Sequence, residues 1–382
     1  MPTAHPPTAG APPPYRIDGT LLERFVADLF ESAGVPAQDA ATVAALLVEA
    51  DRSGVPTHGC MLVPLYLERI IAGSVNAEAD IQVVSDSGTM VVLDARNALG
   101  QLSSIYSIDL AIARAGVHGI GLVATRHAFH FGRGAPYARR AAEAGLIGVA
   151  LSNTRPLMPA PGGSNPAIGN NPVSVAIPRA GHPPVVVDLA LSETSMGALR
   201  VAAASGLDIP PTWATDSAGN VTTDPEVALG GMLLPSGGHK GFSLALVVEV
   251  MTSVLAGGAV GPRVQGLYGD RSVPYDCSHF FAAVSPAASG DPSGFAERME
   301  ELCGWITGPG DRLPGDRLPG DRLPGTRLPG DRLPGTRLPG DRSRMAAEEA
   351  DRSGVPLYPS VVEDLRRIGG QMSVDTSLLA DE

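Results

Sequence analysis

The chain has 382 residues, with 28 lysines and arginines against 40 aspartates and glutamates, and a formal net charge of −12. Such an acidic chain offers no basic surface to nucleic acid or to an anionic membrane, so we exclude both as partners. Hydrophobic residues make up 44% of the chain, which is enough for a large core.

The N-terminal part is predicted to be a tail followed by helices. Residues 1–14 contain six prolines and almost nothing to bury, which predicts a disordered Pro-rich tail. Residues 15–80 form a helical segment, because apolar residues recur at helical spacing over 21–29, 39–51 and 62–71. Asp18 is placed to cap the first of these helices.

Residues 81–308 alternate between helix and strand patterns, which predicts an α/β core. The short apolar runs 81–84 and 90–93 flank Ser-Asp-Ser-Gly and predict a hairpin. Further helices are predicted at 102–115, 136–144, 242–255 and 295–306, and further strands at 119–124, 147–152, 173–177, 185–189 and 279–284. The longest apolar run, 242–260, contains Glu249 and several glycines, which favours a buried helix over a membrane span.

A pentapeptide repeat occupies most of 309–342. Residues 311–340 read DRLPG three times, then TRLPG, DRLPG and TRLPG. A period of five fits neither helix nor strand, and each unit carries Pro-Gly, so we expect an exposed loop of successive turns. An ordered turn spiral or a binding array is the alternative. Residues 343–382 return to helical character, with helices at 343–353 and 359–368.

The cysteines and the N-terminus favour a cytoplasmic protein. Cys60, Cys277 and Cys303 are odd in number and widely spaced, with neither a CxxC pair nor a metal-ligand spacing, which is typical of a reduced chain. No basic region precedes an apolar core at the N-terminus, so we expect no signal peptide.

Two segments have the spacing of known binding motifs but lack the context that these motifs need. Residues 119–124 fit GxGxxA, but the dinucleotide fingerprint needs a strand before it and a helix after it. Here that order is reversed, so we expect a tight helix-to-strand turn. His127 and His130 have a spacing that two metal ligands can share, but no third ligand follows at a recognisable distance, so we expect no metal site.

Five other segments combine glycines with polar residues at the ends of apolar runs. They are 52–59, 127–132, 152–156, 187–190 and 237–242. A lone loop histidine is more often structural than catalytic, but these segments together are typical of ligand-binding loops. Asp188 ends a strand, where it is placed to cap a turn, to bind a ribose hydroxyl or to orient a histidine. Lys240, the only lysine in the chain, lies in the last segment.

The order and spacing of these segments resemble the malate/L-lactate dehydrogenase family, which is distinct from the Rossmann-fold dehydrogenases. That family includes ureidoglycolate and sulfolactate dehydrogenases and cyclic imino acid reductases. The matching segments are Thr57-His58-Gly59, His130-Phe131-Gly132, Gly145-Leu-Ile-Gly148, Asn153-Thr154, Gly169-Asn-Asn171-Pro172, Val187-Asp188-Leu189-Ala190 and Gly237-Gly238-His239-Lys240-Gly241-Phe242. Arg337-Leu-Pro-Gly340-Asp341 resembles a single family turn that is copied several times here.

The resemblance implies an α/β, non-Rossmann malate/L-lactate dehydrogenase-like fold with a mixed sheet and an N- and C-terminal helical part. It also implies a homodimer that uses NAD or NADP to act on a small 2-hydroxy or 2-oxo acid. A proton must reach the oxygen or nitrogen beside the reacting carbon, and an imidazole with an ordinary pKa of about 6.5 suits that task. His130 is preferred over His58 for this role, with Asp188 and Thr57 as orienting partners.

The same resemblance implies that 81–308 is the cofactor- and substrate-binding core, and it implies which residues line the cofactor. They are His130, Phe131, Gly132, Asn153, Thr154, Asp188, Leu189, Ala190, Gly238, Lys240, Gly340 and Asp341. An ammonium at a glycine-rich helix start suits a phosphate or a carboxylate. Chance retention of Lys240 is the alternative.

The chain departs from the family pattern around the substrate. Leu62 stands where the family carries a carboxylate-binding arginine, and Ala198 stands where it carries a lysine. Conversely, Arg133 and Arg155 occupy positions where small residues are usual. We therefore expect either that an arginine among Arg52, Arg133 and Arg155 replaces the missing clamp, or that the substrate is unusual.

Two other functions compete with this interpretation. One is a cyclic imino acid reductase, or a reductase of a specialised pathway, that acts on a larger substrate. The other is a non-catalytic homologue that uses the repeat as an interaction loop. Thr57, His58, His130 and Asp188 are all present, which argues against the non-catalytic alternative.

Overall fold

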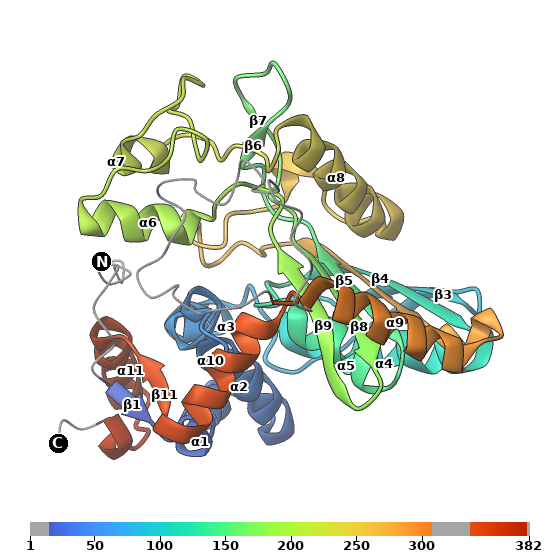
Figure 1. Cartoon of the computed structure of the whole chain (residues 1–382). Helices are drawn as coiled ribbons and strands as arrows, with labels where there is room; N and C mark the ends of the chain where they lie inside the picture. Colours follow the sequence, from blue (N-terminus) through green and yellow to red (C-terminus); the bar gives the residue numbers. More distant parts are fainter. Residues whose placement is uncertain (1–14, 308–336, 380–382) are drawn as a thin grey trace.

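The computed structural model describes residues 15–307 and 337–379, and the predicted tail and the repeat units before residue 337 lie outside this part. The fold is α/β, with a central mixed sheet and a separate group of helices built from the two ends of the chain (Figure 1). Among the described residues, no helix is long and apolar enough to cross a membrane.

The central sheet has seven strands in the order β2-β3-β4-β10-β5-β8-β9. Only the β3–β4 pair is parallel, and the other neighbours are antiparallel. The strands are β2 (Gln82–Asp86), β3 (Met90–Asp94), β4 (Ile120–Ala128), β5 (Ile147–Ser152), β8 (Val173–Arg179), β9 (His182–Leu189) and β10 (Cys277–Val284). The predicted hairpin at 81–93 is confirmed as β2–β3.

Helices cover both faces of this sheet because its strands are apolar on both sides. Phe281 and Ala283 of β10 pack toward α4 (Gly100–His118) and α5 (Ala135–Glu143). Phe280 and Ala282 point the other way, toward α8 (His239–Glu249). The 119–124 segment is the predicted helix-to-strand turn: Gly119 ends α4 at φ +79°, and a Cβ at Gly121 would collide with a carbonyl of α4.

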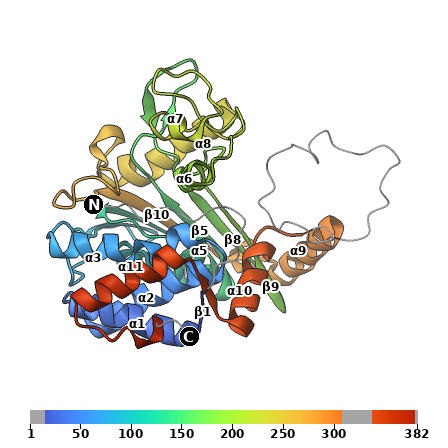
Figure 2. The same ribbon diagram turned by 90° about the vertical axis from the view of Figure 1, so that its left-hand side faces the viewer.

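The two ends of the chain form one helical part, as both views show (Figures 1 and 2). It contains α1 (Gly19–Ser32), α2 (Ala37–Arg52), α3 (Val63–Ile71), α10 (Asp341–Ser353) and α11 (Pro359–Gln371). Asp18 caps α1 by accepting from the backbone N–H of Thr20 and Leu21. The prediction of helices alone is incomplete, because β1 (Tyr15–Ile17) pairs with β11 (Val355–Leu357) and ties the two ends together.

Several elements differ from the predictions. The predicted buried helix at 242–255 begins at His239 as α8 and continues as a π-helix over Val250–Val254. It is only half-buried, since Leu244 and Val247 are 55% and 56% exposed. The sequence patterns missed β6 (Met158–Pro159), β7 (Pro166–Ile168), α6 (Met196–Ser205) and α7 (Pro225–Leu229), and placed α9 (Pro292–Thr307) at 295–306. The Ser195 cap and Gly206 at the end of α6 were usable signals.

Candidate active site

A cavity of about 2000 Å³ lies between the helical part and the α6 side of the core. Its walls come from segments far apart in the sequence, which the fold brings together. The predicted residues that line it are Thr57, His58, His130, Phe131, Gly132, Arg133, Thr154, Arg155, Asp188, Leu189, Ala190, Gly340 and Asp341. Arg52 is not among the lining residues, because it points to α10 and pairs with Asp351.

His58 sits on a 3₁₀ turn, Pro56–His58, that is fastened to α2. The Thr57 hydroxyl lies 3.0 Å from Nδ1 of His58. Behind the turn, the buried Asp51 accepts a 2.7 Å hydrogen bond from the backbone N–H of Cys60. A Cβ at Gly59 would collide with this carboxylate, which explains the glycine. Burial raises the pKa of Asp51 to about 7, although the Cys60 hydrogen bond opposes the shift.

His130 faces the same cavity and is held by a tyrosine that the sequence did not single out. The Tyr66 hydroxyl lies 2.6 Å from Nδ1 of His130 and also donates to its backbone carbonyl at 3.3 Å. The rings of His58 and His130 stack with centroids 5.7 Å apart. Within 15–307 and 337–379, neither Nε2 has a hydrogen-bond partner.

Both imidazoles are biased toward the neutral form. Burial lowers the pKa of His130 well below its usual range, and the charges of His58 and His279 add to that effect. Burial also lowers the pKa of His58, with the Asp188 carboxylate raising it and the Arg133 guanidinium lowering it. Each ring is therefore a proton acceptor near neutral pH, and each acquires a proton most readily when an anion lies beside it.

Asp188, at the end of β9, forms hydrogen bonds with two side chains of the protein. Its Oδ2 accepts from Nε of Arg133 at 3.1 Å, and its Oδ1 accepts from the Ser174 hydroxyl. Arg133 also lies 3.7 Å from Oε2 of Glu49 on α2, and its side chain is only 7% exposed. Of the roles weighed for Asp188, the described contacts give it an arginine partner, and no histidine hydrogen-bonds to it.

The Asn153-Thr154 segment divides between core and cavity. Asn153 is fully buried and donates to the Ser253 hydroxyl at 2.6 Å, whereas Thr154 lines the cavity. Asn171 accepts from the backbone N–H of Thr154 at 3.0 Å and donates to Glu249 at 2.9 Å. The buried Glu249, which the sequence showed only as a charge in an apolar run, therefore anchors this loop to α8.

A second cavity, of about 530 Å³, adjoins the end of β9 and the start of α8. Its lining surface is mostly apolar, with Leu189, Leu191 and Leu244 among the lining residues, and its polar members are Ser192, Thr194, Ser195, Ser236 and Lys240. Lys240 is exposed and has no carboxylate partner in the described part of the chain. Gly238 has a positive φ of 63° and starts α8, but it lines neither cavity.

The arginines that could replace the missing carboxylate-binding arginine differ in whether the guanidinium group already has a partner. Leu62, where the family arginine is missing, is 1% exposed and belongs to the core of the helical part. The Arg133 guanidinium is already paired with two carboxylates. Arg155 lines the cavity and is exposed, and none of the described residues forms a hydrogen bond or an ion pair with its side chain.

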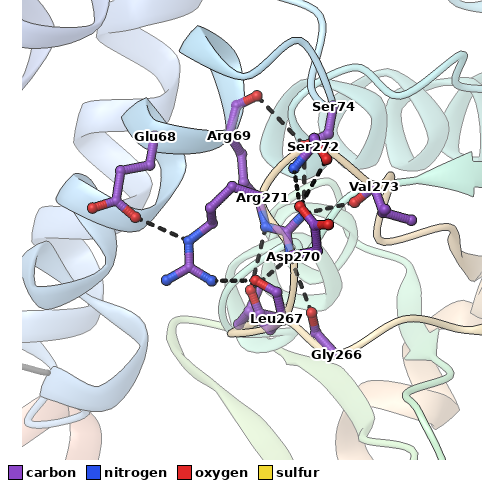
Figure 3. Close-up of polar contacts among 10 residues, drawn as sticks. Glu68, Arg69, Ser74, Gly266, Leu267, Asp270, Arg271, Ser272 and Val273 are labelled. Atoms are coloured by element: carbon purple, nitrogen blue, oxygen red, sulfur yellow. Dashed lines mark hydrogen bonds and ion pairs between the residues drawn. The ribbon is translucent and has the colours of Figure 1, made fainter. Parts of the chain in front are cut away.

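The loop 266–273 forms a further wall of the cavity and is held by a buried arginine (Figure 3). Arg69 of α3 is fully buried and donates to the carbonyls of Gly266 (3.0 Å), Leu267 (2.8 Å) and Val273 (2.9 Å). Beside it, Glu68 pairs with Arg271 at 2.9 Å. Tyr268 at the tip of the loop lies under the guanidinium of Arg200, which comes from α6.

The last repeat unit reaches the rim of the cavity. The Pro339 carbonyl accepts a 3.0 Å hydrogen bond from the backbone N–H of Val186 on β9. Gly340 has a φ of +94° and lies so close to Val186 that a Cβ would be crowded. Asp341 accepts from the backbone N–H of Leu338 at 3.0 Å and starts α10. This single turn is therefore structural.

No group of three or more histidine, cysteine, aspartate or glutamate side chains in the described ranges has the arrangement of a metal site.

The chain is similar to known proteins of the family that its motifs resemble. The sequence profile of the malate/L-lactate dehydrogenase family matches residues 17–327. A malate dehydrogenase of Pyrococcus horikoshii is 31% identical over 94% of this chain and 96% of its own length. An NADP⁺-dependent (2R)-3-sulfolactate dehydrogenase of Chromohalobacter salexigens is 36% identical, covering 77% and 88%. The structure of a delta1-piperideine-2-carboxylate reductase of Pseudomonas syringae superposes with a TM-score of 0.80 at 27% identity, covering 93% and 99%.

Proposed function

Because the chain belongs to the malate/L-lactate dehydrogenase family, an oxidoreductase family, we propose that it is an NAD(P)-dependent dehydrogenase or reductase of a small 2-hydroxy or 2-oxo acid. The observation that carries this proposal is the pair of imidazoles, each held at Nδ1 by a hydroxyl with Nε2 left without a partner, in the wall of one large cavity. A cyclic imino acid is the alternative substrate, supported by the likeness to the piperideine-carboxylate reductase.

The residues present fit a nicotinamide cofactor. The cavity of about 2000 Å³ has room for both a dinucleotide and a small acid. The adjoining hydroxyls of Ser195 and Ser236, together with the Lys240 ammonium at the start of α8, are donors that suit phosphate oxygens. When bound, the cofactor supplies or accepts the hydride.

The histidines supply the proton. In the direction of oxidation, a neutral imidazole accepts the substrate hydroxyl proton at Nε2, and in the direction of reduction the imidazolium returns it. Thr57 fixes the ring of His58, and Tyr66 fixes the ring of His130. Replacing each histidine by asparagine separates their roles, since the variant that has lost the proton-transfer group should lose kcat by 100-fold or more while still binding reduced cofactor.

We place the substrate carboxylate on Arg155. Its guanidinium lines the cavity and is free of protein carboxylates in the described structure, whereas Arg133 is paired and Arg52 lies outside. Arg155 lines the same cavity as both histidines and as Tyr275, whose ring lies 6.4 Å from that of His130.

We also infer a cytoplasmic homodimer. The free thiols of Cys60, Cys277 and Cys303 support a reducing compartment. The dimer surface is proposed to be the exposed apolar side of α8 and the following π-helix. It consists of Leu244, Leu246, Val247, Val250, Val254 and Leu255, each at least 45% exposed. Replacing Val247 by glutamate should convert a dimer to a monomer in analytical ultracentrifugation, and a wild-type monomer would contradict the assignment.

Fluorescence titration of the purified protein with NADH and NADPH tests the cofactor directly. Saturable binding of either one supports the proposal. Absence of binding to both favours the non-catalytic alternative.

A further inference from the structure

A line of alternating charges runs from the protein surface to the wall of the cavity that His58 lines. It starts at Glu143 and Arg139 of α5, which lie 3.4 Å apart, and continues through Glu49 of α2, 3.1 Å from Arg139. Arg133 follows at 3.7 Å from Glu49, and Asp188 at 3.1 Å from Arg133. Exposure falls along this line, from 63% for the side chain of Glu143 to 7% for that of Arg133. The Arg133–Asp188 pair at the inner end, 7% and 20% exposed, is therefore far better shielded than the Glu143–Arg139 pair at the surface.

Arg133 is bound more firmly to Asp188 than to Glu49. Nη1 of Arg133 and Oε2 of Glu49 are both buried without a hydrogen bond, which marks a loose ion pair, whereas Nε of Arg133 donates directly to Asp188. With Ser174 on the other oxygen, the Asp188 carboxylate is held from two sides. Because Asp188 is held by Arg133 and Ser174, it does not bind His58. Within the described residues, Nδ1 of His58 is bound by the Thr57 hydroxyl and by no carboxylate.

We propose that Arg133 is a positioning residue for His58: it fixes the Asp188 carboxylate and cancels its charge beside the imidazole. This inference rests on the proposed oxidoreductase function and identifies His58 as the group whose proton affinity the arginine controls. The charged and titratable groups around His58 are Asp188 from β9, Arg133 and His130 from the segment after β4, and Asp51 from α2 behind the turn. Glu49 of α2 pairs with Arg133. Without Arg133, the net charge near the ring becomes negative, and a negative neighbour favours the imidazolium.

The test is the pH dependence of kcat/KM for the wild type and for Arg133→Gln, measured with the best substrate found at 340 nm. For oxidation, which needs the neutral imidazole, the acidic limb of the Arg133→Gln profile should move up by roughly one pH unit. Asp188→Asn should move the limb down. The double variant Arg133→Gln/Asp188→Asn should return close to the wild-type position, because both charges are gone.

Two controls separate charge from structure. Arg133→Lys keeps a cation and should shift the limb less than Arg133→Gln. Arg139→Gln removes the cation on the far side of Glu49 and should leave the limb within about 0.2 pH units of wild type, because the charge is distant and more exposed. A loss of kcat in Arg133→Gln with an unshifted profile overturns the inference, and so does a double variant that keeps the full shift.

Failure of the inference is distinguishable from failure of the proposed function. If the wild type neither binds reduced nicotinamide nor turns over any acid or imine, the proposed function is wrong. If the wild type turns over and only the shift is missing, the function stands and Arg133 does not tune His58. A titration of the His58 imidazole by NMR, in a protein without substrate, gives the same answer independently of turnover.

Discussion

Asp51 is the residue whose charge state is most strongly tied to the geometry of the site. It is buried behind the His58 turn, and its acceptor role toward Cys60 needs an oxygen but not a charge. Its pKa rises from 3.8 to about 7, so the native state binds a proton between these pH values that the unfolded state has released. Stability should therefore fall as pH rises from about 4 to 7, and level off above pH 7.

The variant Asp51→Asn keeps an acceptor and removes the buried charge. We expect it to be more stable than the wild type at pH 8, with an upper bound of about 4 kcal/mol from the size of the pKa shift, and to lose most of that advantage by pH 5. Thermal unfolding at both pH values measures the difference. Asp28→Asn, on the exposed face of α1, is the matched control. An advantage equal at pH 5 and pH 8 would contradict the assignment.

Arg155 offers a second prediction at the residue scale. Arg155→Ala should raise KM for the acid substrate by roughly 10- to 100-fold, because a charge-assisted pair with a carboxylate is lost, and should change cofactor affinity little. Arg263→Ala removes an exposed arginine that does not line the cavity and serves as the control. Equal KM values in Arg155→Ala and wild type would show that another group binds the carboxylate.

At the element scale, α3 organises the site. Within one turn of this helix, Glu68 holds Arg271 and Arg69 holds the carbonyls of the loop 266–273 (Figure 3). Tyr66 of the same turn holds His130. A buried guanidinium without a carboxylate is stable here because its N–H groups meet carbonyl oxygens. The loop that carries Tyr268 to the cavity wall is therefore fixed by its contacts with α3.

Arg69→Lys should loosen this loop, because a compact ammonium cannot span the carbonyls that the guanidinium reaches from Nε, Nη1 and Nη2. We expect faster hydrogen exchange over 266–273 and a raised KM, with kcat changed less. Glu68→Gln breaks only a partly exposed ion pair and should have a small effect. Unchanged exchange in Arg69→Lys would show that the loop is held by other contacts.

The elements also show what could be predicted from the sequence. Helices such as α1 and α4, and the hairpin β2–β3, follow from local periodicity, caps and turn residues. The pairing of β1 with β11 joins residues more than 300 positions apart, and the contact of Tyr66 with His130 spans 64 positions. No local pattern encodes such contacts, so Tyr66, Arg69 and Glu249 appeared in the sequence only as members of apolar helices.

The candidate site was predictable as a set of segments but not as a geometry. The family motifs placed Thr57, His58, His130 and Asp188 in one site, and the fold brings all four to one cavity. The pairing of Asp188 with Arg133, and the departure of Arg52 toward α10, depend on side-chain packing between distant elements. The order of the seven strands in the sheet and the exposed face of α8 likewise follow from tertiary packing.

At the scale of the whole molecule, the repeat tests which parts of the chain the activity needs. Among the described residues, the turn from Arg337 to Asp341 bonds to β9 and starts α10. Deleting residues 311–335 leaves one complete pentapeptide, so kcat/KM should stay within about twofold of wild type. The midpoint of thermal unfolding should change little, because loop length changes stability only weakly. A loss of turnover in the deletion variant would mean that the repeat contacts the site.

We propose that one cavity brings a nicotinamide, an imidazole and a small acid together. The most direct test of this proposal is a panel of 2-oxo acids and cyclic imino acids, each offered with NADH and with NADPH, followed by absorbance at 340 nm. We predict cofactor oxidation with at least one 2-oxo acid or cyclic imine, and its loss in the His58→Asn/His130→Asn double variant. Cofactor oxidation that persists in that variant, or none with any member of the panel, would contradict this account.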